Sequence, residues 1–174
     1  MRIQYRVMHM CLAALAIAGV SSARAQTTSW GDVSVSAVRI DYDLSGTGNA
    51  PGLAIRSTKN LWSNLAVEFG GVYAKPDQQF GTSSLFMPEA QLRYRWNAGR
   101  FFPYVGGGIG AARVKSDFHT DWDPTMSFSA GTGVHVTDRL AVTGEFRLRA
   151  HEWRSVGTTA EISAGLAWHL PGVR

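Results

Sequence analysis

The chain has 174 residues, 45% of them hydrophobic, and a formal net charge of +4, a length that predicts one domain. Three positive charges, on Arg2, Arg6 and Arg24, lie in an expected export signal, and removing them leaves +4 − 3 = +1. So small an excess gives nucleic-acid binding no electrostatic support.

Residues 1–25 predict a cleavable secretory signal peptide. A positively charged start precedes the apolar run Met10–Val20, and Ala23–Ala25 has the A-x-A form of a cleavage site. The only cysteine, Cys11, lies inside that run without a lipobox-like sequence before it. The remaining domain, residues 26–174, is therefore expected to be exported and to fold without disulfides.

After the signal, no run of about 18 apolar residues occurs, so no transmembrane helix is expected. A membrane protein without helices must be a closed barrel. Eight segments alternate between apolar and polar residues, as β-strands do: Asp32–Leu44, Gly52–Lys59, Leu65–Ala74, Leu85–Trp96, Phe102–Val114, Met126–Val136, Leu140–Ala150 and Thr159–Leu170. Longer connections alternate with short ones. We expect an all-β fold, an eight-stranded antiparallel up-and-down transmembrane β-barrel.

The first two segments alternate less regularly than the others. In the first, Val35 and Val38 fall on opposite faces unless the strand slips by one residue, which predicts a β-bulge near Ala37. In the second, Arg56 and Lys59 blur the pattern. The second segment is therefore the weakest match to a strand.

The third to seventh segments alternate well. Phe69 opposes Glu68 in the third segment, and Leu92 opposes Arg93 in the fourth. The fifth contains the glycine-rich stretch Pro103–Gly110, and repeated glycine would weaken an isolated strand. In a small barrel these glycines are expected to give room for large side chains across the lumen or for sharp coiling.

The final segment carries a candidate assembly signal. Ser163 and Gly165 precede Trp168 and Leu170 in the order polar–x–Gly–x–x–aromatic–x–apolar. This order resembles the C-terminal signal of bacterial outer-membrane barrels, which implies recognition by the barrel-assembly machinery and closure against the first strand. The sequence departs from that pattern in ending on a leucine rather than an aromatic residue and in continuing through Pro171–Arg174.

The two faces of the strands predict the orientation of the barrel. The polar faces carry ionisable groups of both signs that can pair across a narrow lumen: Glu68, Glu89, Arg93, Arg95, Glu145, Arg147, Arg149 and Glu161. Aromatic residues near the strand ends are typical of two interfacial girdles: Tyr42, Trp62, Trp96, Phe102, Tyr104, Trp153 and Trp168. Both patterns favour an apolar outer face. The alternative is a secreted soluble barrel that binds a small apolar ligand inside.

Two stretches resemble a known family. Pro103–Gly110 (PYVGGGIG) is similar to the PYVGxGxG strand of the opacity-protein-like outer-membrane β-barrel family, and Gly133–Arg149 is similar to its seventh strand and preceding turn. Met87–Trp96 resembles OmpW-type barrels. The resemblance implies an eight-stranded barrel like OmpA, OmpX or OmpW in the cell outer membrane, but it implies no ligand. A lumen of this size is filled by its own side chains.

The long connection Lys115–Thr125 holds the best metal-like cluster, formed by Asp117, His119, Asp121 and Asp123. It lacks the glycine and the terminal glutamate of a calcium loop, so a solvated loop is favoured and no metal or cofactor is expected. Phe118 and Trp122 in the same connection are candidates to contact lipopolysaccharide or a partner.

A lipid A-modifying enzyme is the main alternative function, because such enzymes share this architecture and need a nucleophile beside a base. His151 and Ser155 are the residues to suspect, whereas His135 and His169 fall on inward faces and no His-x-Ser motif occurs. We expect instead a non-enzymatic monomer that serves envelope integrity or surface interaction through its extracellular loops. Its expected partners are outer-membrane lipid, lipopolysaccharide and the assembly machinery.

Overall fold

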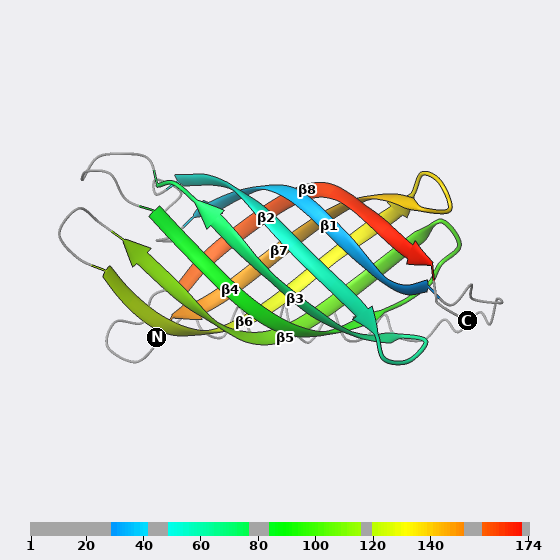
Figure 1. Cartoon of the computed structure of the whole chain (residues 1–174), viewed down its shortest axis with the longest axis horizontal. Coiled ribbons are helices and arrows are strands. Elements are labelled where there is room, and N and C mark those ends of the chain that lie inside the picture. The colour runs from blue at the N-terminus through cyan, green and yellow to red at the C-terminus, as the bar shows by residue number, and fades with distance from the viewer. Residues whose placement is uncertain (1–28, 42–48, 77–83, 116–119, 152–157, 172–174) are drawn as a thin grey trace, which may run out of the picture.

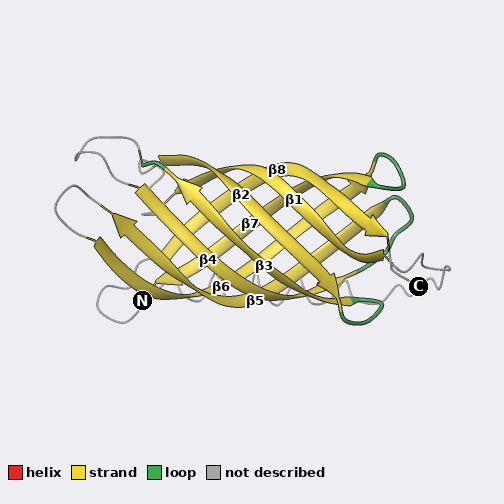
Figure 2. Ribbon diagram, viewed as in Figure 1, coloured by secondary structure: helices red, strands yellow, loops and turns green. Residues whose placement is uncertain are grey.

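The computed structural model describes residues 29–41, 49–76, 84–115, 120–151 and 158–171. It contains eight strands: β1 Ser29–Asp41, β2 Asn49–Asn60, β3 Leu65–Ala74, β4 Ser84–Arg95, β5 Phe101–Lys115, β6 Thr120–His135, β7 Leu140–His151 and β8 Thr158–Pro171. Each strand pairs antiparallel with the next, and β8 pairs with β1, which closes the barrel (Figure 1 and Figure 2). The eight-stranded up-and-down barrel is thus confirmed. The predicted signal peptide lies outside the described residues.

The two ends of the barrel differ. Residues 61–64, 96–100 and 136–139 form short turns at the end where β1 begins and β8 ends, which we call the turn end. At the opposite end, which we call the loop end, β1, β3, β5 and β7 end and β2, β4, β6 and β8 begin (Figure 1). Gly99, with a φ of 71°, sits in the turn between β4 and β5, where a residue with a Cβ atom would be strained.

The outward face of the barrel is apolar. Large hydrophobic side chains are exposed around its whole circumference, with Ile109 67%, Met126 70% and Ile162 64% exposed. The inward face holds most of the charged residues of the strands, among them Arg147, Arg149 and Glu161, which are at most 2% exposed. So much exposed apolar surface suits lipid and not water, so the soluble-barrel alternative is wrong. No helix long and apolar enough to cross a membrane occurs in the described part of the chain.

The bulge predicted near Ala37 is wrong. The register between β1 and β8 runs without a break from Gly31 opposite Leu170 to Asp41 opposite Ala160, and its one irregularity lies before Gly31. Val38 and Ile40 simply face inward, at 5% and 0% exposure. The lumen is apolar at that height, so the strand needs no slip to bury them.

The connection between β5 and β6 at the loop end is shorter than expected. Their ladder continues to Lys115 opposite Thr120, so β6 begins six residues before the predicted Met126. Asp121 and Asp123, which we expected in a solvated loop, therefore belong to a strand. The other strands agree with the predicted segments within a few residues where the structure describes them.

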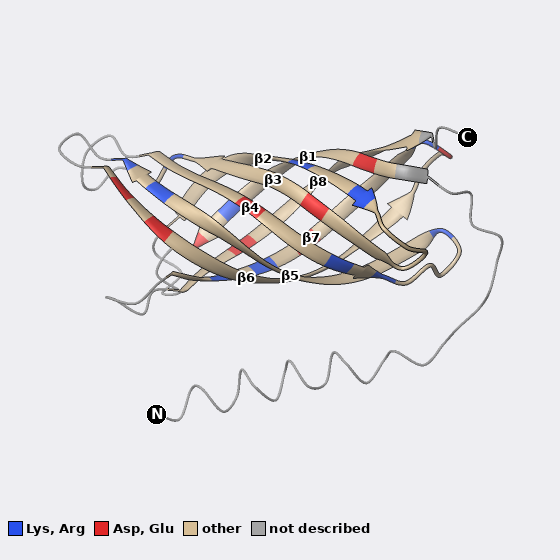
Figure 3. Ribbon diagram, turned by 60° about the horizontal axis from the view of Figure 1, so that its bottom comes forward, with Lys and Arg blue, Asp and Glu red and all other residues tan. Residues whose placement is uncertain are grey.

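The lumen has three layers along its length. Nearest the loop end, nine inward apolar residues pack into one cluster: Val38, Ile40, Ala50, Ala54, Val72, Ala74, Leu85, Met87 and Ala112. Charged residues fill the middle (Figure 3). Nearest the turn end, a second apolar cluster contains Phe102, Tyr104, Ala141 and Ala167. The middle layer holds most of the buried charged residues that the structure describes.

Candidate functional site

Four arginines and four glutamates meet in the middle of the lumen: Arg56, Arg93, Arg147, Arg149, Glu68, Glu89, Glu145 and Glu161. None of these residues is more than 8% exposed. Their formal charges sum to 4 − 4 = 0, so the barrel encloses no net charge here. We call these eight residues the lumen charge network.

Arg147 on β7 is the centre of the network. It contacts Glu145 at 2.6 Å and Glu68 at 3.0 Å, and it also pairs with Glu89. Two residues further along β7, on the same face, Arg149 pairs with Glu89 at 2.8 Å and with Glu161 at 2.7 Å. Because alternate side chains of a strand point to the same face, β7 alone places Glu145, Arg147 and Arg149 in the lumen.

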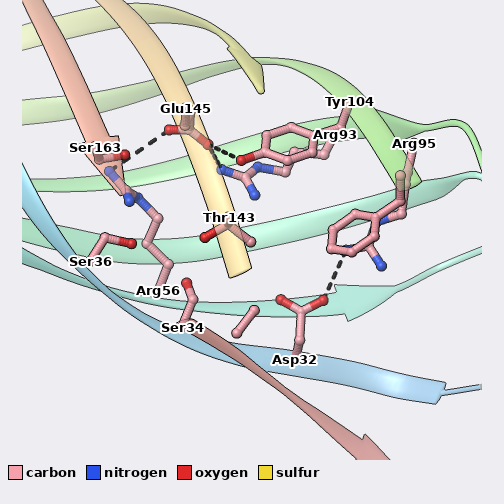
Figure 4. A pocket seen from close by; sticks show the side chains of 12 residues that line it. Asp32, Ser34, Ser36, Arg56, Arg93, Arg95, Tyr104, Thr143, Glu145 and Ser163 are labelled. Atoms are coloured by element: carbon pink, nitrogen blue, oxygen red, sulfur yellow. Dashed lines mark hydrogen bonds and ion pairs between the residues drawn. The ribbon is translucent and has the colours of Figure 1, made fainter. Parts of the chain in front are cut away.

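Arg93 and Arg56 complete the network on the side toward the turn end. Arg93 lies 2.8 Å from Glu68 and pairs with Glu145. Arg56 pairs with Glu161 at 2.5 Å and lies 3.8 Å from both Glu68 and Glu145. Figure 4 shows Arg56 and Arg93 converging on Glu145 from different strands.

Tyr104 joins the network through its hydroxyl, which donates a hydrogen bond of 3.0 Å to Glu145. The Arg93 guanidinium lies 4.4 Å from the centre of the Tyr104 ring, a cation–π contact. A glycine opposite makes room for this ring, because a Cβ atom at Gly131 would lie 2.5 Å from it. Gly133 accommodates the Phe102 ring in the same way, at 2.0 Å.

Seven of the eight charged residues singled out in the sequence lie in this network, and Arg95 does not. Arg95 pairs with Asp32 at 2.8 Å nearer the turn end, with its guanidinium 5.0 Å from the Phe102 ring. Sequence reasoning missed Arg56 and Asp32. The signal available in the sequence was the alternation of Leu53 and Ile55 with Ala54 and Arg56, which places Arg56 on the face opposite the two large apolar side chains.

The assignment of Phe102 and Tyr104 to an interfacial girdle is wrong, since both face the lumen at 3% and 5% exposure. Trp62 and Trp168, at 68% and 53% exposure, do project outward near the turn end. Trp96 follows β4 and stacks edge-on against Tyr94 with ring centres 4.9 Å apart. Tyr42 and Trp153 lie outside the described residues.

A small cavity lies between the network and the turn end (Figure 4). Its volume is about 20 Å³, which is room for roughly one water molecule. Polar side chains of Asp32, Ser36, Thr143 and Ser163 line it together with arginines of both groups. Toward the loop end the fully buried apolar cluster begins. This cavity is therefore too small for a ligand larger than a water molecule.

The histidines do not assemble a catalytic group among the described residues. His151 Nε2 lies 3.2 Å from the Thr159 hydroxyl, and Ser155, its suspected partner, lies outside the described residues. His135 and His169 face inward as predicted, with ring centres 4.8 Å apart beside Phe102.

The described residues contain no group of three or more metal-ligating side chains arranged for a metal ion. Of the acidic cluster singled out in the sequence, Asp117 and His119 lie outside the described residues. Asp121 and Asp123 lie on β6, opposite Val114 and Ala112 of β5. The cluster thus has no described geometry as a site.

The candidate assembly signal lies on β8 against β1. Trp168 faces outward, whereas Ser163 is 5% exposed in the lumen. Gly165 packs closely on β1, because a Cβ atom there would lie 2.2 Å from the Val35 carbonyl oxygen. Leu170 is opposite Gly31. Recognition of these residues by the assembly machinery stays a prediction.

Comparisons with known proteins agree with this geometry. The outer membrane protein beta-barrel domain family matches residues 10–169. A comparison with curated proteins finds no match. Among solved structures, Neisserial surface protein A (NspA) superposes with a TM-score of 0.63 at 15% identity, covering 79% of this chain and 94% of that one.

Two further barrels are similar in fold. The N-terminal barrel of Pseudomonas aeruginosa OprF has a TM-score of 0.54 at 14% identity, covering 79% of this chain and 99% of its own. The attachment invasion locus protein Ail of Yersinia pestis has a TM-score of 0.51 at 8% identity, covering 80% and 96%. From the family match and the apolar outer face it follows that the chain belongs to the outer-membrane β-barrel family and resides in the cell outer membrane.

Proposed function

We propose that this protein is a non-enzymatic outer-membrane barrel that supports envelope integrity or surface interaction through its loop end. The observation that carries the proposal is the closed lumen. Eight paired charges fill its middle, and a fully buried apolar cluster seals the side toward the loop end. With the lumen closed, the surface available for interaction is the exterior.

Passive diffusion through the barrel is disfavoured for two separate reasons. The cavity of about 20 Å³ is too small for a hydrated solute, and an ion crossing the apolar cluster would lose its hydration without a compensating ligand. Eight-stranded barrels generally have lumens filled by side chains. The family name alone should therefore not suggest a pore.

The fold is compatible with recognition at the cell surface. One structure of Yersinia pestis Ail holds the heparin analogue sucrose octasulfate, on a barrel with a TM-score of 0.52 and 12% identity to this chain. That binding is a property of Ail, and at this identity only the fold is shared. It supports the general idea that an eight-stranded barrel can serve as a binding protein.

Two measurements test the proposal. The first is single-channel recording of the refolded mature chain in planar bilayers, where we expect no conductance steps. The second is mass spectrometry of lipid A from cells with and without the gene, where we expect identical acyl and phosphate patterns together with greater detergent sensitivity of the deletion strain. Discrete conductance steps would contradict the closed lumen, and an altered lipid A pattern would favour the enzyme.

A further inference from the structure

The outward faces of β4, β5 and β6 change from apolar to basic toward the loop end. Arg113 on β5 lies opposite Phe86 on β4 and Trp122 on β6. Residues that pair directly across antiparallel strands share a face, so these three side chains form one outward row. Ile109 and Met126, which are opposite each other, belong to the apolar band below it.

Lys115 forms the next row outward from Arg113. It lies opposite Ser84 and Thr120, neither of which is charged. Asp121 and Asp123 alternate with Trp122 along β6 and therefore project to the opposite face. Within the described loop-end residues of these three strands, the outward face thus carries two positive charges and no carboxylate.

The side chains of this patch are placed for contact with a membrane lipid. The Arg113 guanidinium lies 5.8 Å from the centre of the Trp122 ring. Arg113 is partly buried, and its Nε atom is itself covered and has no hydrogen-bond partner among the described residues, so any contact with a lipid is left to its terminal nitrogens. Trp122 is 55% exposed and Phe86 41% exposed. A cation held against an exposed aromatic ring is a typical arrangement at a membrane interface.

The height of the patch follows from strand geometry. A strand rises about 3.3 Å per residue and tilts by about 40° in such barrels, so each residue climbs roughly 2.5 Å, and the apolar band of about 25 Å spans about ten residues. Phe101, 56% exposed at the turn end of β5, marks the lower boundary. Ten residues further is Ala111, so Arg113 and Lys115 lie about 5 and 10 Å above the band, at headgroup height.

We propose that Arg113, Lys115 and Trp122 bind a phosphate-bearing lipid of the outer leaflet, of the lipid A type. The guanidinium can donate two parallel hydrogen bonds to a phosphate, and the ammonium adds a point charge. The acyl chains of the lipid then lie along Ile109 and Met126. This inference rests on the proposed function, since it identifies one ligand of the loop end.

The test compares phosphorylated lipid A with its dephosphorylated counterpart of identical acyl chains, titrated onto the refolded mature chain in detergent and followed by native mass spectrometry. We expect Arg113→Gln or Lys115→Gln to weaken binding about fivefold, and the double variant roughly 25-fold. The charge-matched control is the double variant Arg39→Gln with Lys75→Gln, which removes two other cations near the loop end. Arg39 lies on β1, and Lys75 directly follows β3. That control should change binding less than twofold.

Three results would overturn the site. The first is equal affinity for the two lipids, and the second is an equal loss of lipid affinity in the patch and control variants. The third is complete displacement of the phosphorylated lipid by millimolar inorganic phosphate, which would indicate a site for phosphate and not for the lipid. Trp122→Leu should weaken binding of both lipids, because it removes the aromatic contact. None of these outcomes alters the bilayer recordings, so failure of the lipid site and failure of the proposed function are separable.

Discussion

Glu145→Gln is the most informative single change in the lumen charge network. The amide has nearly the same shape as the carboxylate, but the substitution leaves four arginines facing three glutamates, or 4 − 3 = +1. Glu145 pairs with Arg93 and Arg147 and accepts the Tyr104 hydroxyl. Removing one partner of a buried ion pair costs about 3–5 kcal/mol. We expect the free energy of unfolding to fall by that amount.

Two companion variants identify the cause of the loss. Glu145→Gln combined with Arg93→Gln restores neutrality. The loss of unfolding free energy in the double variant should therefore be smaller than the sum of the two single losses by about 1–3 kcal/mol. Asp138→Asn changes the charge of an exposed residue in the turn between β6 and β7 and should alter stability by no more than about 0.5 kcal/mol.

The measurement is urea unfolding of the refolded barrel in phosphatidylcholine vesicles, followed by tryptophan fluorescence. Mobility on SDS gels without boiling gives an independent reading, since a closed barrel without edges should stay folded in SDS at room temperature. A loss below about 1 kcal/mol for Glu145→Gln, or strictly additive losses in the double variant, would refute the view that paired charges hold the lumen together.

Three further changes test the orientation, the packing and the assembly signal. Phe146→Arg places a charge on the lipid face of β7 and should destabilise the barrel in vesicles by about 2–4 kcal/mol; no change in the urea midpoint would contradict an outward Phe146. Gly133→Ala should lower stability by about 1–3 kcal/mol through a clash with the Phe102 ring, and Phe102→Leu in the same chain should restore part of it. Trp168→Ala with Leu170→Ala should reduce the outer-membrane fraction of the protein without reducing its export, and normal fractionation would show that the signal was misread.

The strands could be predicted wherever the lumen is polar. In β7, Phe146 differs strongly in polarity from its neighbours Glu145 and Arg147. The alternation of side chains along a strand therefore predicts which residues face the lipid and which face the lumen. β1 is different, because Val35 meets lipid while Val38 meets the apolar cluster of the lumen. Toward the loop end the inward face of β1 becomes apolar at Val38 and Ile40, while its outward face becomes charged at Arg39. The polarity of the two faces therefore reverses along the strand, and a bulge was a reasonable but wrong explanation.

The aromatic residues show a second limit of sequence reasoning. Phe102 and Tyr104 occupy a strand end, where an aromatic residue is typical of the membrane interface. Their inward orientation depends on Gly131 and Gly133 of β6, which provide the space for the two rings. That pairing becomes visible only when the register of β5 against β6 is known.

Which charges meet cannot be obtained from any one strand. Arg147 contacts Glu68 and Glu89, which are 79 and 58 residues away in the chain and lie on β3 and β4. Alternation can place all three side chains in the lumen, but only closure between β1 and β8 fixes their relative heights and brings β7 opposite β3. Because a carboxylate left unpaired in so narrow a space would be strongly unfavourable, the four glutamates required a fourth arginine from some inward position. Arg56 on the irregular β2 supplies it, and its inclusion in place of Arg95 still leaves four arginines and four glutamates in the network.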